Sequence, residues 1–222
     1  HWSQHALIMK LSEETKEILK NFCGINNSIF FKGGNSLSTI SVTNNIFAKA
    51  EITEDFPIPF AIYDLSQFLG GMSLFNDPTL DFDNASYMLI KNGRSKVKYF
   101  FADPDVIAKP PEKDIQLPEH QFSFKLTDET LTSLLKGARV YDLPDLCLES
   151  EGGEVSLVVK DKDNDTSNSV LYQVGESEVP FKFNFKIENI RIIPGTYNVE
   201  VSQRVARFSN TGLRLEYYIA LE

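Results

Sequence analysis

Two stretches of the chain carry the same arrangement of apolar and polar positions. Residues 11–24 read LSEETKEILKNFCG, and residues 126–141 read LTDETLTSLLKGARVY. In both, apolar residues recur every three or four positions, which places them on one face of a helix. These faces consist of Ile18, Leu19, Phe22 and Cys23 in the first stretch and of Leu131, Leu134, Leu135 and Ala138 in the second. Both stretches are therefore predicted to be amphipathic helices.

The two predicted helices also begin alike. A hydroxyl residue, Ser12 or Thr127, stands where its side chain can accept the unpaired N–H groups of the first turn. Two acidic residues follow in each case, where the helix dipole favours negative charge. The polar faces then carry basic residues, namely Lys16 and Lys20 in the first helix and Lys136 and Arg139 in the second.

A second pair of segments repeats in the same order. Ile58–Tyr63 (IPFAIY) is matched by Val179–Asn184 (VPFKFN), at nearly the same separation along the chain as the two helices. Two ordered matches favour an internal repeat over coincidence. Because only two copies fit into 222 residues, the pattern indicates a duplicated domain rather than a solenoid.

The rest of the chain consists mostly of short apolar runs separated by turn-forming residues, which predict antiparallel strands. Helical spacing returns in residues 64–75 and near residues 186–192, so two helices are expected in each half. Residues 105–120 are rich in proline and are predicted to form an extended connector. The pattern therefore predicts an α+β protein with two similar strand-rich domains, residues 9–104 and 121–222.

Composition sets limits on the class of protein. The chain is 42% hydrophobic, with 17 Phe and 8 Tyr, which is enough for a substantial core. No apolar run approaches the roughly 18 residues that span a bilayer, and no signal peptide is visible. Residues 1–8, HWSQHALI, precede Met9 and are interpreted as a cloning leader. Cys23 and Cys147 are predicted to be buried free thiols.

A net charge of −9 argues against a protein that binds DNA by overall attraction. Binding to nucleic acid would need positive charge gathered on one face, and the polar sides of the predicted helices offer such a face. No aromatic residue is interleaved with these cations, so contact with backbone phosphate is expected rather than base stacking. Taken alone, however, a pair of lysines on a helix is usually a solvated surface.

Motifs of catalysis are nearly absent. The sequence lacks a phosphate-binding loop, a nucleophile elbow and a C-x-x-C pair, and His120 is the only histidine after the leader. Asp81 and Asp83 alternate along a predicted strand, where an exposed face is the simplest interpretation. No catalytic residue is expected, although a hydrolase with an unrecognised carboxylate cleft stays open as an alternative.

A metal site is not expected either. Asp161, Asp163 and Asp165 resemble the start of a calcium-binding loop. That loop requires Gly and Glu where this chain has Thr166 and Tyr172. The segment is therefore predicted to be a solvated hairpin loop, and no cofactor is predicted for the protein.

Several blocks, in order along the chain, match a known family. They are Met9-Lys10-Leu11-Ser12 with Ile18-Leu19-Lys20-Asn21-Phe22, Ala61-Ile62-Tyr63-Asp64-Leu65 with Phe68-Leu69 and Ser73-Leu74, Ala102-Asp103-Pro104, Pro194-Gly195 with Tyr197, and Ala220-Leu221-Glu222. In these blocks the chain, from Met9 to Glu222, resembles the DNA sliding clamps, or polymerase processivity factors, of T-even-type tailed bacteriophages.

The resemblance implies the DNA-clamp fold and a ring-shaped homotrimer, with helices lining a central hole and antiparallel sheets outside. A closed ring holds duplex DNA topologically, so weak, sequence-independent contacts with backbone phosphate suffice and allow sliding. Glu13 departs from the family, because relatives carry basic residues there. The cations expected to face the duplex are Lys16, Lys20, Lys136, Arg139 and Arg191, with Lys10, Lys125 and Lys186 as weaker candidates.

The resemblance also implies partners. These are a replicative DNA polymerase and an ATP-dependent clamp loader, in the cytoplasm of the infected bacterial host and away from any membrane. Partner peptides are expected in an apolar pocket beside the connector, with walls from Ile107, Pro110, Ile115, Leu117 and Pro118 and from Tyr217, Tyr218 and Ile219 of the last strand. For the last three, an ordinary core strand is the alternative. From the residues alone, a β-rich structural or interaction protein of a virion stays the alternative function.

Overall fold

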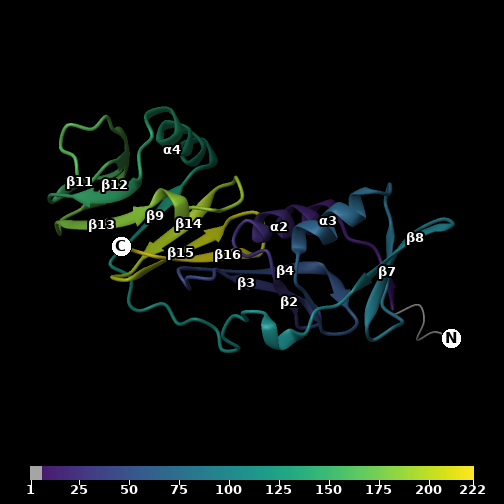
Figure 1. Ribbon diagram of the computed structural model, residues 1–222. Helices are drawn as coiled ribbons and strands as arrows, with labels where there is room; N and C mark the ends of the chain where they lie inside the picture. The colour runs from purple at the N-terminus through teal and green to yellow at the C-terminus, as the bar shows by residue number, and fades with distance from the viewer. Residues whose placement is uncertain (1–6) are drawn as a thin grey trace. The chain divides into compact units, whose positions relative to one another are not determined.

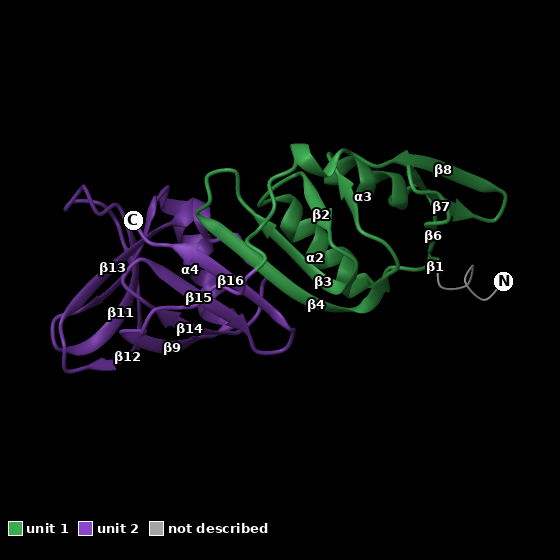
Figure 2. Cartoon of the chain, turned by 90° about the horizontal axis from the view of Figure 1, so that it is seen from below, with its two compact units in different colours: residues 1–112 green, residues 113–222 purple. Residues whose placement is uncertain are grey.

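The structure is a computed structural model that describes residues 7–222 (Figure 1). The chain divides into two compact units, residues 1–112 and residues 113–222 (Figure 2). Both units have the same order of elements, namely a strand, a helix, four strands, a helical segment and three strands. The predicted α+β class and the internal duplication are therefore confirmed.

Unit 1 opens with a strand and the first amphipathic helix. Its elements are β1 (Ile8–Met9), α2 (Glu13–Cys23), β2 (Ile29–Phe31), β3 (Gly34–Ile40), β4 (Ile46–Phe56), β5 (Phe60–Ile62), α3 (Leu65–Ser73), β6 (Thr79–Asp81), β7 (Tyr87–Asn92), β8 (Ser95–Phe100) and the 3-10 turn η1 (Pro104–Val106). Ile8, which the sequence pattern assigned to the leader, pairs with Asp81. Residues 1–6 of that leader lie outside the described residues.

Unit 2 repeats this order with a shorter second helical segment. Its elements are β9 (Phe122–Leu126), α4 (Asp128–Tyr141), β10 (Asp145–Ser150), β11 (Gly153–Lys160), β12 (Val170–Ser177), β13 (Phe181–Lys186), the 3-10 turn η2 (Ile187–Asn189), β14 (Tyr197–Val201), β15 (Val205–Asn210) and β16 (Leu215–Ala220). The prediction of a helix near residues 186–192 is therefore wrong. Only one 3-10 turn fits between the end of β13 and Pro194, which cannot continue a helix.

Strand pairing is duplicated as well, and among residues 7–222 the pairs within each unit are antiparallel. The order β1-β6-β7-β8 in unit 1 corresponds to β9-β14-β15-β16 in unit 2. The pairs β2-β5 and β3-β4 correspond to β10-β13 and β11-β12. In unit 2, β10 also pairs with β11, which joins these strands into the sheet β12-β11-β10-β13. The echoed Pro-Phe segments begin equivalent strands, β5 and β13.

Both amphipathic helices form as predicted. The side chains of Ser12 and Thr127 accept hydrogen bonds from the N–H groups of Thr15 and Thr130, which fixes the first turn of α2 and of α4. The predicted apolar faces are buried at Ile18, Leu19, Phe22, Leu131, Leu134 and Ala138. No helix among residues 7–222 is long and apolar enough to cross a membrane.

Helix α4 lies directly against β12. A Cβ atom at Gly137 would stand 2.9 Å from the Cγ2 atom of Val170, closer than side chains pack. The hydroxyls of Ser133 and Tyr172 also form a hydrogen bond between the two elements. Glycine at position 137 therefore allows the helix to approach the strand.

The two cysteines have different surroundings. Cys147 is buried in β10, where burial raises the pKa of its thiol to about 11, so the thiolate is scarce at neutral pH. Cys23 is only half-buried, which corrects the prediction that both thiols are buried. Its place at the last turn of α2 leaves the sulfur beside Asn27, to which it donates a hydrogen bond.

The aspartates that the sequence analysis singled out lie in two different environments, Asp81 in a strand and residues 161–165 in a loop. Asp81 is buried rather than exposed, because its carboxylate accepts a 2.6 Å hydrogen bond from Lys91 of the neighbouring strand. Burial opposes its ionisation most strongly, but the bonds from Lys91 and from the Asp83 N–H, together with the positive charge of Lys91 and Lys96, outweigh burial and lower the pKa of Asp81. Residues 161–169 form the loop between β11 and β12, as predicted. Within residues 7–222, no cluster of His, Cys, Asp and Glu could hold a metal ion.

Candidate functional site

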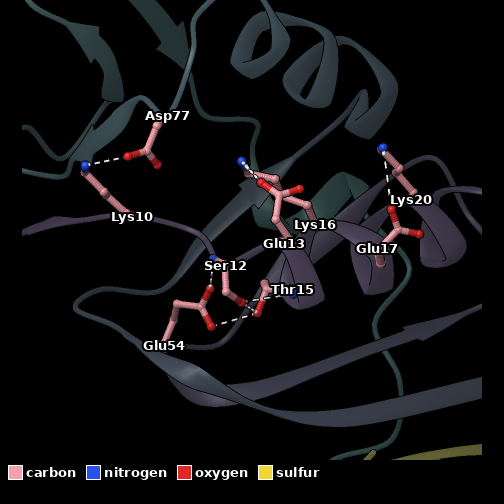
Figure 3. Close-up of polar contacts among 9 residues, drawn as sticks. All are labelled: Lys10, Ser12, Glu13, Thr15, Lys16, Glu17, Lys20, Glu54 and Asp77. Atoms are coloured by element: carbon pink, nitrogen blue, oxygen red, sulfur yellow. Dashed lines mark hydrogen bonds and ion pairs between the residues drawn. The ribbon is translucent and has the colours of Figure 1, made fainter.

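The cations predicted around α2 each lie beside a carboxylate (Figure 3). Lys16 Nζ is 3.1 Å from Glu13, one turn earlier on the helix, and Lys20 Nζ is 3.8 Å from Glu17. The Lys16 side chain is only 21% exposed, whereas that of Lys20 is 65% exposed. The surface of α2 is therefore nearly balanced in charge.

Lys10, just before α2, is also paired. Its Nζ donates a 2.8 Å hydrogen bond to Asp77, and this bond lowers the pKa of the Asp77 carboxyl (Figure 3). Both side chains are largely exposed, so the pair contributes little to stability. Such an exposed pair can open, which leaves the lysine able to contact another anion.

A carboxylate that the sequence analysis missed fixes the start of α2. Glu54 of β4 accepts one 2.7 Å hydrogen bond from the Ser12 N–H and a second from the Thr15 hydroxyl (Figure 3). Burial opposes ionisation of Glu54, but these bonds and one from Thr53 outweigh it, so its pKa lies below the usual value. The alternation of β4 places Glu54 between buried Ile52 and Phe56, and this sequence pattern could have revealed it.

We expect Glu54→Gln to destabilise the protein by about 1–3 kcal/mol at pH 7, because Gln accepts these bonds without charge. A lowered folded pKa means that the ionised carboxylate stabilises the fold above its unfolded pKa of about 4.3. That stability is lost as pH falls through the folded pKa. Urea unfolding between pH 7 and pH 3 measures the difference between the variant and the wild-type chain.

Glu51→Gln is the matched control, because Glu51 is exposed on the opposite face of β4. The unfolding free energies of Glu54→Gln and wild type should converge as pH falls. A constant difference down to pH 3 would argue that the charge of Glu54 is unimportant and that only its shape matters.

Helix α4 separates its charges along its length. Its acidic residues, Asp128 and Glu129, occupy the first turn, whereas Lys136 and Arg139 lie near its end. Both basic side chains are exposed, and among residues 7–222 neither forms an ion pair. Because they are three positions apart, they lie on one side of the helix and present positive charge that no ion pair within residues 7–222 neutralises.

The other predicted cations of unit 2 are exposed too. Lys125 lies in β9, and Lys186 ends β13. Arg191 follows η2, and its Nε donates a 2.8 Å hydrogen bond to the carbonyl of Glu188. The structure thus places one set of candidates around α2 in unit 1 and another on α4, β9 and the η2 segment in unit 2.

The residues predicted to line a peptide pocket differ in exposure. Ile107 is buried, Pro110, Ile115 and Leu117 are half-buried, and Pro118 is exposed. The three candidates in the last strand, Tyr217, Tyr218 and Ile219, are 0%, 5% and 0% exposed. Their burial fits the alternative of an ordinary core strand, and the pocket stays a prediction.

Comparison with known proteins assigns both halves of the chain. Residues 12–109 match the family "DNA polymerase processivity factor", and residues 123–222 match "gp45 sliding clamp, C terminal". The sliding clamp of Vibrio phage KVP40 is 33% identical, over 96% of this chain and 99% of that protein. The sliding clamp of Enterobacteria phage T4 is 30% identical, over 96% of this chain and 97% of that protein.

A solved structure shares the fold at much lower identity. The A. fulgidus PCNA, with the C-terminal region of FEN-1 bound, aligns with a TM-score of 0.72 at 14% identity, over 97% of each chain. This likeness confirms the DNA-clamp fold, and the family matches account for both duplicated units. The chain belongs to the sliding clamp family of phage DNA polymerase processivity factors.

Proposed function

We propose that three copies of this chain close into a ring around duplex DNA and tether the replicative DNA polymerase to its template. The duplicated unit carries this proposal. Each unit places an amphipathic helix, α2 or α4, at the same point of the same fold, with basic residues on its solvent side. An acidic chain can retain a polyanion if the ring closes around it and turns these cations inward.

Weak contacts with phosphate are sufficient in such a ring. Lys136, Arg139 and Arg191, with Lys125 and Lys186, offer positive charge from unit 2. In unit 1, the ion pairs of Lys10 and Lys20 are exposed and that of the half-buried Lys16 has an exposed partner, so all three are weak enough to exchange a carboxylate for a phosphate oxygen. None of these contacts reads a base, so the ring would slide along the duplex.

Two strand edges suit closure of the ring. Among residues 7–222, β8 pairs only with β7, and β12 pairs only with β11. Strand β8 follows Arg94 and carries Lys96 and Lys98. It ends at Phe100, which is 64% exposed. An edge of this kind is a ready template for a strand from another copy.

Strand β12 has the complementary order of residues. It begins near Leu171, which is 60% exposed, and its end carries Glu176, with Glu178 just beyond. Antiparallel pairing of β8 with β12 of the next copy would place Phe100 toward Leu171 and the lysines toward the glutamates. This arrangement joins unit 1 of one copy to unit 2 of the next, head to tail, and three such joints close a trimer.

The remaining roles follow from tethering. The chain itself would carry out no catalysis, and an ATP-dependent loader would open the ring in the cytoplasm of the infected bacterial host. In the A. fulgidus structure, a C-terminal region of FEN-1 is bound to the PCNA. By analogy, we assign partner peptides of the polymerase and the loader to the apolar residues of the connector, among them Ile115 and Leu117.

Retention on circular DNA tests this proposal. The chain is loaded onto nicked circular DNA with the phage loader and ATP, and the DNA-bound fraction is isolated by gel filtration. A ring should stay on the circle and leave within minutes after a restriction enzyme linearises it. An enzyme without a site on that DNA is the control. Equal retention on circular and linear DNA would contradict encirclement and favour ordinary binding.

A further inference from the structure

Two tyrosines hold a single residue of the segment after η2. The hydroxyl of Tyr197 donates a hydrogen bond to the carbonyl of Ile193, and the Ile193 N–H donates a 3.1 Å hydrogen bond to the hydroxyl of Tyr217. Both backbone polar groups of Ile193 are therefore paired with side chains rather than with a neighbouring strand. The backbone is fixed at this residue on both sides.

The tyrosines are themselves rigidly placed. Both are 0% exposed, and their ring centroids lie 6.1 Å apart in an edge-to-face arrangement. Burial raises the pKa of Tyr197 to about 12 and raises that of Tyr217 as well, so both hydroxyls remain protonated at neutral pH. The two rings come from β14 and β16, so the sheet of unit 2 sets the position of Ile193.

Arg191 stands two residues before this fixed point. Ile190 and Ile192 on either side of it are buried, at 6% and 7% exposure, whereas Arg191 is exposed. The bond from Arg191 Nε to the Glu188 carbonyl further restricts its side chain. The anchored backbone therefore limits the directions in which the exposed Arg191 side chain can point. A side chain restricted in this way loses less conformational entropy when it binds.

We infer that Tyr197 and Tyr217 are positioning residues that aim Arg191 at backbone phosphate in the hole of the ring. The inference rests on the proposed function, which places Arg191 against the duplex. It also gives Tyr217 a role inside unit 2, in place of the peptide-pocket wall predicted for it.

The test combines Tyr217→Phe with Arg191→Ala. Binding of the assembled trimer to a short fluorescent duplex is measured by anisotropy across a range of salt concentrations. Arg191→Ala should lower the slope of log affinity against log salt by about 0.9 for each phosphate that the variant no longer neutralises. Tyr217→Phe should weaken binding about threefold, as expected for the removal of one hydrogen bond. In the Arg191→Ala background, Tyr217→Phe should have no further effect.

Three controls separate positioning from general destabilisation. Ser150→Ala removes the hydroxyl of a buried residue of unit 2, which accepts a hydrogen bond from the Gly152 N–H, and should leave duplex binding unchanged. Tyr217→Phe combined with Lys136→Ala should be additive, because Lys136 lies on α4. Tyr197→Phe, as a second variant, should show the same dependence on Arg191 as Tyr217→Phe.

Additive effects of Tyr217→Phe and Arg191→Ala would overturn the inference, since the tyrosine would then act elsewhere. An unchanged salt slope in Arg191→Ala would also overturn it. Neither result would contradict encirclement, which the circular-DNA experiment and the α4 variants test separately.

Discussion

Replacing Lys96 and Lys98 with glutamate is expected to dissociate the ring into monomers at concentrations where the wild-type chain is a trimer. In the proposed joint, both lysines approach Glu176 and Glu178 of the next copy. Juxtaposed like charges cost several kcal/mol, and each 1.4 kcal/mol weakens association about tenfold. Light scattering over a dilution series measures the shift directly.

Reversing the charges of the opposite strand, β12, as well should restore the trimer. A chain with Lys96→Glu, Lys98→Glu, Glu176→Lys and Glu178→Lys again brings opposite charges together at every joint. Lys32→Glu with Lys113→Glu makes the same change in net charge at exposed residues away from both strands. A trimer that survives the first variant, or a fourfold variant that stays monomeric, would exclude β8 and β12 as the joint.

Reversal of the two basic residues of α4 should shorten processive synthesis while the trimer persists. Lys136→Glu with Arg139→Glu removes two exposed cations that form no ion pair within residues 7–222. The change should lower the salt slope of duplex binding by about 0.9 for each phosphate that these cations neutralise. Product length on a primed circular template, with polymerase and loader present, measures the consequence.

A control pair outside the connector, Lys32→Glu with Arg204→Glu, changes two exposed cations and should leave product length unchanged. Light scattering of the α4 variant must still show a trimer, which separates weaker DNA binding from failure of the ring to assemble. Full-length products from an intact trimeric α4 variant would remove α4 from the DNA-facing surface.

Much of this fold could be predicted because its signals are local. The caps at Ser12 and Thr127 and the apolar faces of α2 and α4 depend on residues only a few positions apart. The internal repeat depended on comparing the chain with itself, and it specified the order of elements in both units. Predictions failed where contacts between elements decide whether a residue is buried. Asp81 is an example, because its partner Lys91 lies on the next strand.

For the candidate DNA-facing residues, the sequence predicted exposure to solvent but not the contacts that they make. Helical periodicity identified Lys16, Lys20, Lys136 and Arg139 as solvent-facing cations, and all but the half-buried Lys16 are exposed. It did not reveal that Lys10 reaches Asp77, which lies 67 positions away in the sequence. The pairing of Ile193 with two tyrosines was missed as well, since one of the two hydroxyls belongs to Tyr217, which lies 24 positions away.

The unequal pairing of the cations on α2 and α4 bears on how an encircled duplex could turn. A three-copy ring would alternate helices whose lysines are paired with carboxylates and helices whose Lys136 and Arg139 are not, so attraction would come from three places around the bore. The duplex repeats about every 10.5 base pairs, so its phosphates do not lie opposite all three places at the same angle of the DNA. No angle of the DNA would be strongly preferred, so rotation inside the ring should be nearly as free as travel along the axis.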